Sequence, residues 1–381
     1  MNDLLFLSAL LAHVPEHPVP HAGDAVRLDY APDPRGVAVS VRAAADGTAT
    51  LTVTAPADEV ERSVSAAQAA IVRSHGGDPR DAQAFEQART RMGIMAFANA
   101  VNRLVRQRLF SLAVMLTGIL PFFAPRYLEG AAPRPGEPYT FEVEVLLRPA
   151  SELSSYEPTC VSLPSTVPVT EDDVEQALGA MLGGSINFTN MPDEARASFD
   201  RLRDEARSQL EAQRASERTA ALIDRATDAL AERLVSQPPQ GYVELMRNQM
   251  ANQFAASVEA SGTPWDSYTA DPSYNEEAFK ASMTAQALQA LRRGMVLDAV
   301  AAHEGIRLTL DDVLAALGSV ARGRETVAAQ AMLDNGQLPQ LCEVALRAKA
   351  GEWVARHAED AAGEKPSDAE GVSATGRPAS A

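Results

Sequence analysis

The chain has 381 residues, a length that ordinarily holds two or three domains and can bury a sizeable core. Apolar residues make up 46% of it and aromatic residues only 5%, a composition that favours helices over sheets. The formal net charge of -17 opposes direct, high-affinity binding to DNA or RNA, because neutralisation of phosphates supplies most of that binding energy.

Residues 1–23 form an N-terminal extension that contains the apolar block "MNDLLFLSALLAHVPEH". Asp3 stands where a secretory signal peptide carries positive charge, and no A-x-A cleavage site follows, so we expect no cleaved signal. Histidines recur every four residues in this extension, at His13, His17 and His21. On a helix they would form a metal-binding face, but the intervening prolines forbid that helix, so we expect an extended segment without a metal.

Residues 24–148 have the pattern of a small α+β domain. Apolar and polar side chains alternate over "GVAVSVRAAADGTATLTVT" on both sides of Asp46-Gly47, which predicts a β-hairpin. A helix is predicted over "PADEVERSVSAAQAAIV" and a second helical region from Gln83 through Leu120, and "YTFEVEVLLRP" then alternates as a returning strand. This order predicts a small antiparallel sheet with helices covering one face.

The longest apolar run, "LFSLAVMLTGILPFF" from Leu109 to Phe123, is too short to span a bilayer and contains a proline. We therefore expect a buried helix here and no membrane partner. The two cysteines, Cys160 and Cys342, lie in different segments and do not form the pattern of a disulfide framework. Their number and placement favour a reducing, cytoplasmic setting.

Residues 149–193 are a connector that contains several prolines and one predicted helix. In "VTEDDVEQALGAMLGG", Thr170 is a predicted N-cap, acidic residues fill the first turn, and Gly183-Gly184 ends the helix. A similar stretch, "LTLDDVLAALGSVA", begins at Leu308; the simplest interpretation is two well-capped helix starts without a duplication. Helical periodicity then predicts a mainly α-helical C-terminal domain over residues 194–360, and polar composition predicts a disordered tail over 361–381.

The strand "YTFEVEVLLRP", the segment "SELSSYEP" and the helix "VTEDDVEQAL" together resemble trigger factor, the bacterial chaperone that meets nascent chains at the ribosome. The hairpin followed by "APADEVERSV" is similar to the family's N-terminal domain. The stretches "RATDALAERLVSQPPQGYVELMRNQM" and "ALRRGMVLDAVAAHEGIRLTLDDVLAAL" are similar to its helical C-terminal domain. The resemblance covers residues 36–358 and implies a chaperone domain with helical arms that binds unfolded or nascent polypeptides.

One departure from the family's pattern concerns its enzyme domain. In the family, a V-T-[DE]-x-D-V helix leads into a peptidyl-prolyl isomerase domain. Here only the interval from Leu182 to Glu194 separates that helix from the helical C-terminal domain. The isomerase domain therefore looks absent, and we expect the protein not to be an enzyme.

A second departure concerns ribosome docking, which the family performs through a G-F-R-x-G-K loop. The matching place here is "RSHGGDPRDAQ", whose docking residues would be Arg73, His75, Gly76, Gly77 and Arg80. Asp78 and Asp81 cancel the charge of the two arginines, and the Phe and the Lys are missing. Because such a loop needs positive charge to contact ribosomal RNA phosphates, we expect that docking has been lost.

We find no catalytic constellation in the sequence. His75, His303 and His357 stand alone without a nucleophile motif, and no phosphate-binding glycine loop provides a site for ATP, so we expect no cofactor. The candidate client-binding residues are apolar positions at helical spacing in the C-terminal domain: Met246, Met250, Phe254, Val258, Met283 and Met295. Flexible methionines suit a surface that accepts many apolar segments, and core filling is the alternative interpretation.

The leading hypothesis is therefore an ATP-independent, cytoplasmic holdase that resembles trigger factor without its isomerase domain. Two alternatives stay open at this point. One is an exported assembly chaperone of the periplasmic type, and the other is a dedicated adaptor that binds a single partner. The breadth of the clients would separate a holdase from an adaptor.

Overall fold

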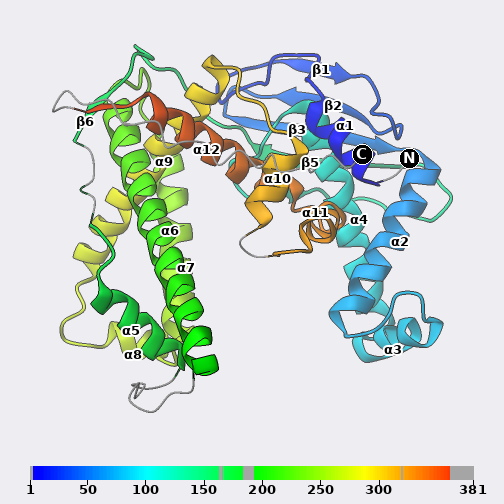
Figure 1. Ribbon diagram of the computed structural model, residues 1–381. Helices are drawn as coiled ribbons and strands as arrows, with labels where there is room; N and C mark the ends of the chain where they lie inside the picture. Colours follow the sequence, from blue (N-terminus) through cyan, green and yellow to red (C-terminus); the bar gives the residue numbers. More distant parts are fainter. Residues whose placement is uncertain (1–2, 163–164, 166, 183–192, 319–320, 361–381) are drawn as a thin grey trace, which may run out of the picture. The chain divides into compact units, whose positions relative to one another are not determined.

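The structure is a computed structural model that describes residues 3–162, 165, 167–182, 193–318 and 321–360 (Figure 1). The chain divides into two compact units: unit 1 contains residues 1–152 and 235–349, and unit 2 contains residues 153–234 and 350–381. No described helix is both long and apolar enough to cross a membrane. The expected helix end at Gly183-Gly184 and the expected disordered tail lie outside the described residues.

Unit 1 contains a five-stranded antiparallel sheet. Its strands are β1 (Arg27–Tyr30), β2 (Ala38–Ala43), β3 (Thr48–Ala55), β4 (Arg126–Tyr127) and β5 (Tyr139–Leu146), in the order β1-β2-β3-β5-β4. The predicted hairpin is confirmed as β2 and β3, and the predicted returning strand is β5, which pairs with β3. In the hairpin turn, Gly47 has a φ of +88°, a conformation that only glycine adopts freely, and Asp46 Oδ1 accepts a hydrogen bond from the Thr48 amide at 2.9 Å.

Helices α2 (Ala57–Ser74), α3 (Ala82–Met92) and α4 (Ile94–Thr117) follow the hairpin, and α4 packs against β2 and β3. Alternate strand side chains, among them Val41, Leu51 and Phe141, are buried beneath the helices, as the period-2 pattern predicts. The predicted apolar face of α2 is also buried. The run from Leu109 is a buried helix only as far as Thr117, where α4 ends with Gly118 as its C-cap, and residues 118–123 of the run are not helical. The α+β prediction is therefore confirmed.

Four further helices contribute to the core of the sheet region: α1 (Asp3–Ala12), α10 (Leu310–Leu317), α11 (Glu325–Asp334) and the beginning of α12 (Leu338–His357). Phe6 of α1 and Leu333 of α11 are each 0% exposed. Just after α11, a Cβ at Gly336 would lie 2.6 Å from the carbonyl oxygen of Gln107 in α4, so only glycine allows this close approach. Residues expected within the helical C-terminal domain thus contribute to the core around the sheet.

The segment from His13 to Ala22 is not helical, as its prolines predict. The ring nitrogen Nε2 of His13 lies 3.1 Å from the carbonyl oxygen of Leu116, and Nε2 of His17 lies 3.0 Å from that of Asp29. These two imidazoles therefore contact different backbone segments of unit 1.

The helices α7 (Gln240–Ala260), α8 (Trp265–Thr269) and α9 (Glu276–His303) form what we call the α7–α9 arm. The Tyr242 hydroxyl donates a hydrogen bond of 2.6 Å to the carbonyl oxygen of Leu147, which fixes the start of α7 to the end of β5. Tyr242 is the buried residue of α7, whereas the buried residues of α9 all lie between Ala287 and Ala301. The end of α7 and the beginning of α9 therefore pack mainly on each other and on α8.

Unit 2 contains α5 (Glu171–Leu182), α6 (Asp193–Ala231) and a short parallel pair formed by β6 (Cys160–Val161) and β7 (Glu359–Asp360). A small core of Val174, Leu178 and Ala206 joins α5 to α6. Glu171 at the start of α5 ion-pairs with two arginines of α6, Arg203 and Arg207. The last part of α12 (Leu338–His357) also belongs to this unit.

The helix starts at Thr170 and Thr309 have the same cap. The Thr170 amide donates to Asp173 Oδ2 at 2.8 Å while the Asp173 amide donates to Thr170 Oγ1 at 3.3 Å, and Thr309 with Asp312 repeats both bonds. The hydrogen bonds from Thr170 lower the pKa of the Asp173 carboxyl. This shared cap accounts for the similar sequences at Val169 and Leu308 without a duplication.

The two cysteines lie in different units. Cys160 is exposed on β6 in unit 2, whereas Cys342 is buried in the core of unit 1. Burial raises the pKa of the Cys342 thiol to about 12, so this thiol stays protonated and unreactive at neutral pH.

Candidate functional site

The predicted client-binding residues of α7 share one face of that helix. Met246, Met250, Phe254 and Val258 recur every four residues, and each side chain is half-buried. A strip at this spacing faces one side of an α-helix, and here that side meets α9. The strip is therefore neither a closed core nor a fully exposed surface.

The two predicted methionines of α9 lie in different surroundings. Met283, near the beginning of α9, is half-buried, whereas Met295 is 4% exposed. Met295 and Met246 both line a hollow of about 70 Å³ at the base of the arm, together with Phe122 and Leu291. Met295 therefore packs the base of the arm, and the half-buried positions extend from Met246 toward the far end.

Five aromatic side chains gather where α7, α8 and α9 meet. Phe254 has its ring centroid 5.5 Å from that of Phe279, 5.8 Å from that of Tyr268 and 6.2 Å from that of Trp265. Trp265 stacks on Tyr268 at 5.4 Å, and Tyr274 contacts the cluster edge-on. All five side chains are half-buried, which is a high concentration of accessible aromatic surface in a chain with only 5% aromatic residues.

Sequence reasoning found only part of this aromatic cluster. Phe254 was predicted as a site residue, but Trp265, Tyr268 and Tyr274 were not. Helix α8 has only 5 residues and Tyr274 lies between α8 and α9, so no periodicity marks a face there. The available signal was compositional: "PWDSYTADPSYNEEAF" holds four aromatic residues close together. Two exposed leucines, Leu245 at 45% and Leu288 at 37%, add accessible apolar surface to the same arm.

Ion pairs hold the base of the arm to the rest of unit 1. Asp298 of α9 binds Arg148 at 3.1 Å and Arg347 at 2.7 Å, and Glu343 of α12 binds the same two arginines at 2.7 Å. Because Arg148 follows β5 directly, this cluster connects the sheet, α9 and α12. The arm thus has a well-fixed base and an end supported mainly by its own side chains.

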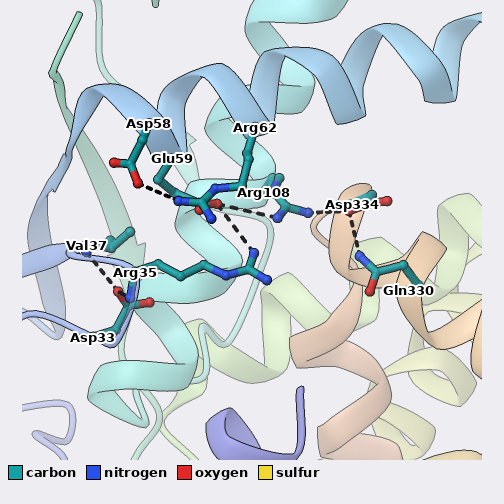
Figure 2. Close-up of polar contacts among 9 residues, drawn as sticks. All are labelled: Asp33, Arg35, Val37, Asp58, Glu59, Arg62, Arg108, Gln330 and Asp334. Carbon is teal, nitrogen blue, oxygen red and sulfur yellow. Dashed lines mark hydrogen bonds and ion pairs between the residues drawn. The ribbon is translucent and has the colours of Figure 1, made fainter. Parts of the chain in front are cut away.

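A second charge cluster, centred on a buried carboxylate, lies near the sheet (Figure 2). The side chain of Glu59 in α2 is 0% exposed and ion-pairs with Arg35 at 3.7 Å, Arg62 at 3.0 Å and Arg108 at 3.4 Å. Arg108 of α4 also binds Asp334, the last residue of α11. The cluster therefore joins α2, α4 and α11.

The chemistry of this cluster is structural. Burial raises the pKa of Glu59, and the guanidinium groups of Arg108, Arg35 and Arg62 act against that shift. The Arg35 guanidinium carbon lies 3.4 Å from the centroid of the Phe6 ring, a cation–π contact that brings α1 into the same cluster. Three cations surround one carboxylate that is itself fully buried, and these contacts fix the helices in place.

Comparison with known proteins bears on the helical part of the chain. Residues 198–356 match the family model described as the C-terminus of bacterial trigger factor protein, and the match includes the whole α7–α9 arm. This chain is trigger-factor-like. The match supports a chaperone-type role and falls on the family's C-terminal region.

Other comparisons add little to this trigger-factor-like assignment. No curated protein matches the chain. One similar solved structure is titled "Promiscuous Substrate Recognition in Folding and Assembly Activities of the Trigger Factor Chaperone". Its sequence is 11% identical to this chain. The alignment covers 83% of this chain and 98% of that chain with a TM-score of 0.35, a value too low to carry an argument.

The loop between α2 and α3, where the sequence resemblance would place a ribosome-docking loop, is a tight turn. Gly76 has a φ of +78°, and the Gly77 amide donates to the carbonyl oxygen of Val72 at 3.0 Å. Asp78 Oδ1 accepts from the Arg80 amide at 3.0 Å, and Asp81 caps α3 by accepting from the Gln83 amide at 2.8 Å. The two aspartates that cancel the charge of the loop therefore also maintain its shape. Arg73, His75 and Arg80 are exposed.

Proposed function

We propose that this protein is an ATP-independent holdase that binds unfolded or nascent polypeptides through apolar side chains of the α7–α9 arm. The observation that supports it is the half-buried strip and aromatic cluster of the arm, within the region that matches the trigger factor C-terminus. Met246, Met250, Phe254, Val258 and Met283 contribute to this surface, and Met295 supports it from beneath.

The residue types of the arm suit clients of varied sequence. Methionine is flexible and polarizable, so a methionine surface adapts to apolar segments of different shapes. Aromatic rings add large contact area at a low cost in side-chain entropy, and the Tyr and Trp polar groups tolerate partial exposure to water. A half-buried surface of this kind binds each segment modestly, which lets clients leave without nucleotide hydrolysis.

We further propose that the protein has no prolyl isomerase activity and acts in the cytoplasm. The end of α5 at Leu182 and the start of α6 at Asp193 leave too few residues between them for a sheet-based domain with an aromatic pocket. Uncatalysed isomerisation of an X-Pro bond faces a barrier of roughly 18–20 kcal/mol, which only a preorganised site lowers. A protease-coupled proline-peptide assay should show no acceleration above background; clear, concentration-dependent acceleration would refute this part.

The holdase proposal is tested by aggregation assays with several unrelated denatured proteins in the absence of nucleotide. The parent protein should suppress aggregation of all of them. Replacing the two exposed leucines of the arm, Leu245→Asp with Leu288→Asp, should weaken apparent client affinity by about tenfold or more, because each buried Leu side chain contributes about 1.5–3 kcal/mol. Circular dichroism should show unchanged helical content.

A matched control uses exposed apolar residues of unit 1 that lie outside the arm. Val327 of α11 is 69% exposed and Val344 of α12 is 63% exposed, so Val327→Asp with Val344→Asp adds the same charge elsewhere. This control should hold clients as well as the parent. Equal loss in both double variants would place client binding outside the arm, and suppression limited to a single protein would favour a dedicated adaptor.

A further inference from the structure

A polar hollow of about 310 Å³ lies between α4 and the segment that follows β4, on the side of α4 opposite its buried residues. Four of its lining residues come from α4: Asn99, Asn102, Arg103 and Arg106. Their spacing places them on one face of the helix, since residues three, four and seven apart are neighbours on a helical surface. Tyr127 of β4 and the backbone near Gly130 form the opposite wall.

Arg106 gives this hollow a fixed wall and a positive charge. Its guanidinium donates hydrogen bonds to the Tyr139 hydroxyl at 2.8 Å and to the carbonyl oxygens of Leu128, Gly130 and Ala131 at 3.2–3.4 Å. All four acceptors are neutral. The bonds therefore satisfy the donors and hold the segment in place, but they leave the charge of Arg106 uncompensated.

The remaining polar groups of the hollow are available to a ligand. Within the described part of the chain, no hydrogen bond or ion pair engages the side chains of Arg103, Asn99 or Asn102, and the Tyr127 hydroxyl also has no hydrogen-bond partner there. Arg103 and Asn99 are exposed, so a solute can reach them. Glu129, the neighbouring acid along the chain, is exposed and does not line the hollow.

This combination differs from an ordinary charged surface. Several other arginines near the sheet are paired with carboxylates, such as Arg126 with Glu144 at 2.8 Å and Arg148 with Glu343 at 2.7 Å. In a chain with a net charge of -17, two arginines side by side without a lining acid form a local cationic site. The Arg103 fork can bind two oxygens of one anion at once, and asparagine amides add further donors.

We propose that this hollow binds the phosphate or carboxylate group of a small anionic ligand. Arg103 makes the charged, two-point contact, Asn99 and Asn102 donate hydrogen bonds beside it, and Arg106 supplies positive charge from a fixed position. The volume lies at the lower end of the range for small-molecule sites, which limits the ligand to a compact anion or the anionic end of a longer one. The site is separate from the α7–α9 arm and does not depend on client binding.

Titration calorimetry of the full chain with inorganic phosphate, and in a second series with succinate, tests this proposal. We expect saturable binding of at least one of the two anions, and the anion with the lower Kd identifies the preferred group. Arg103→Gln should raise that Kd by about tenfold, because it removes the charged hydrogen bonds. Asn102→Asp, a nearly isosteric change that places a carboxylate at the ligand, should abolish binding.

The matched control is Arg134→Gln, which removes an exposed arginine after β4 that pairs with Glu137 at 3.8 Å and does not line the hollow. It should leave the Kd unchanged while altering net charge by the same amount as Arg103→Gln. Absence of saturable binding with both anions would overturn the proposal. Equal weakening in Arg103→Gln and Arg134→Gln would also overturn it, since that result indicates attraction by net charge alone. Circular dichroism of each variant verifies that it is folded.

Discussion

In the sheet of unit 1, Leu51 and Val53 are 0% exposed and Phe141 is 5% exposed, whereas Met250, Phe254 and Val258 of the α7–α9 arm are all half-buried. Both regions have regular apolar patterns in the sequence. In the sheet, α2 and α4 cover the apolar side chains, so the burial of these side chains contributes to folding stability. In the arm, residues of the same type leave part of their side-chain surface exposed to solvent. This exposed surface stabilises the fold less than buried surface does, and it can contact another molecule.

Charged residues show the same difference between the two regions. Around the sheet, Glu59 and Arg108 are almost fully buried and held in a cluster that joins several helices. On the arm, the pair of Glu276 and Lys280 at 2.7 Å is solvent-exposed and lies within a single helix turn. Exposed pairs of this kind add little to stability, whereas a buried cluster is costly to break. Both apolar and ionic contacts therefore fix the sheet region more firmly than they fix the end of the arm.

The largest expected effect comes from breaking the buried cluster. Arg108→Leu should lower the free energy of unfolding by about 3–5 kcal/mol, because it leaves the carboxylates of Glu59 and Asp334 without their shared cation in a buried site. Urea unfolding followed by circular dichroism measures this change. Arg126→Leu is the matched control: its pair with Glu144 is exposed, with the Arg126 side chain at 67%, and its loss should cost no more than about 1 kcal/mol. Equal effects would show that the cluster does not hold the helices.

A smaller effect is expected when the same residue type is shortened in the two regions. Phe141→Ala removes a core side chain and should cost about 3–5 kcal/mol, whereas Phe254→Ala should cost about 1–2 kcal/mol because Phe254 is half-buried. Trp265 lies in the aromatic cluster, so in a Trp353→Phe background its fluorescence follows the arm specifically. Comparable costs for both alanine variants would mean that the arm is a closed core, and the client-binding proposal would lose its basis.

Much of the sheet region could be predicted because its signals are local. Alternation on both sides of Asp46-Gly47 defines the hairpin and which side chains face inward, and the spacing in α2 defines its buried face. Strands β1 and β4 were not predicted, because four residues and two residues are too few for an alternation to show. Those strands exist because β2 and β5 offer free hydrogen-bonding edges.

Packing between distant segments was the part that sequence patterns could not predict. Helical periodicity identifies an apolar face but not its partner, so nothing in the pattern of α11 indicated that Leu333 lies in the core near the sheet. In the candidate site, the face of α7 was predicted by spacing, but the aromatic cluster also needs α8 and the segment after it, which have no period. Met295 has the same spacing signal as Met283, and only its position at the base of the arm makes it buried.

The smallest effect concerns the loop between α2 and α3, whose charge differs from the positive charge that ribosome docking requires. Asp78→Asn with Asp81→Asn removes two negative charges while the amide oxygens can still accept the turn and cap hydrogen bonds from Arg80 and Gln83. We expect the parent to remain in the supernatant when ribosomes are sedimented at low salt. The double variant should gain at most weak binding that disappears as salt rises, because the turn leaves Arg73 and Arg80 without the family's Phe and Lys.

Binding by the parent that is lost in an Arg73→Ala with Arg80→Ala variant would contradict this expectation. It would show instead that two exposed arginines on a tight turn are sufficient for docking, so that the charge-cancelling aspartates act mainly as caps.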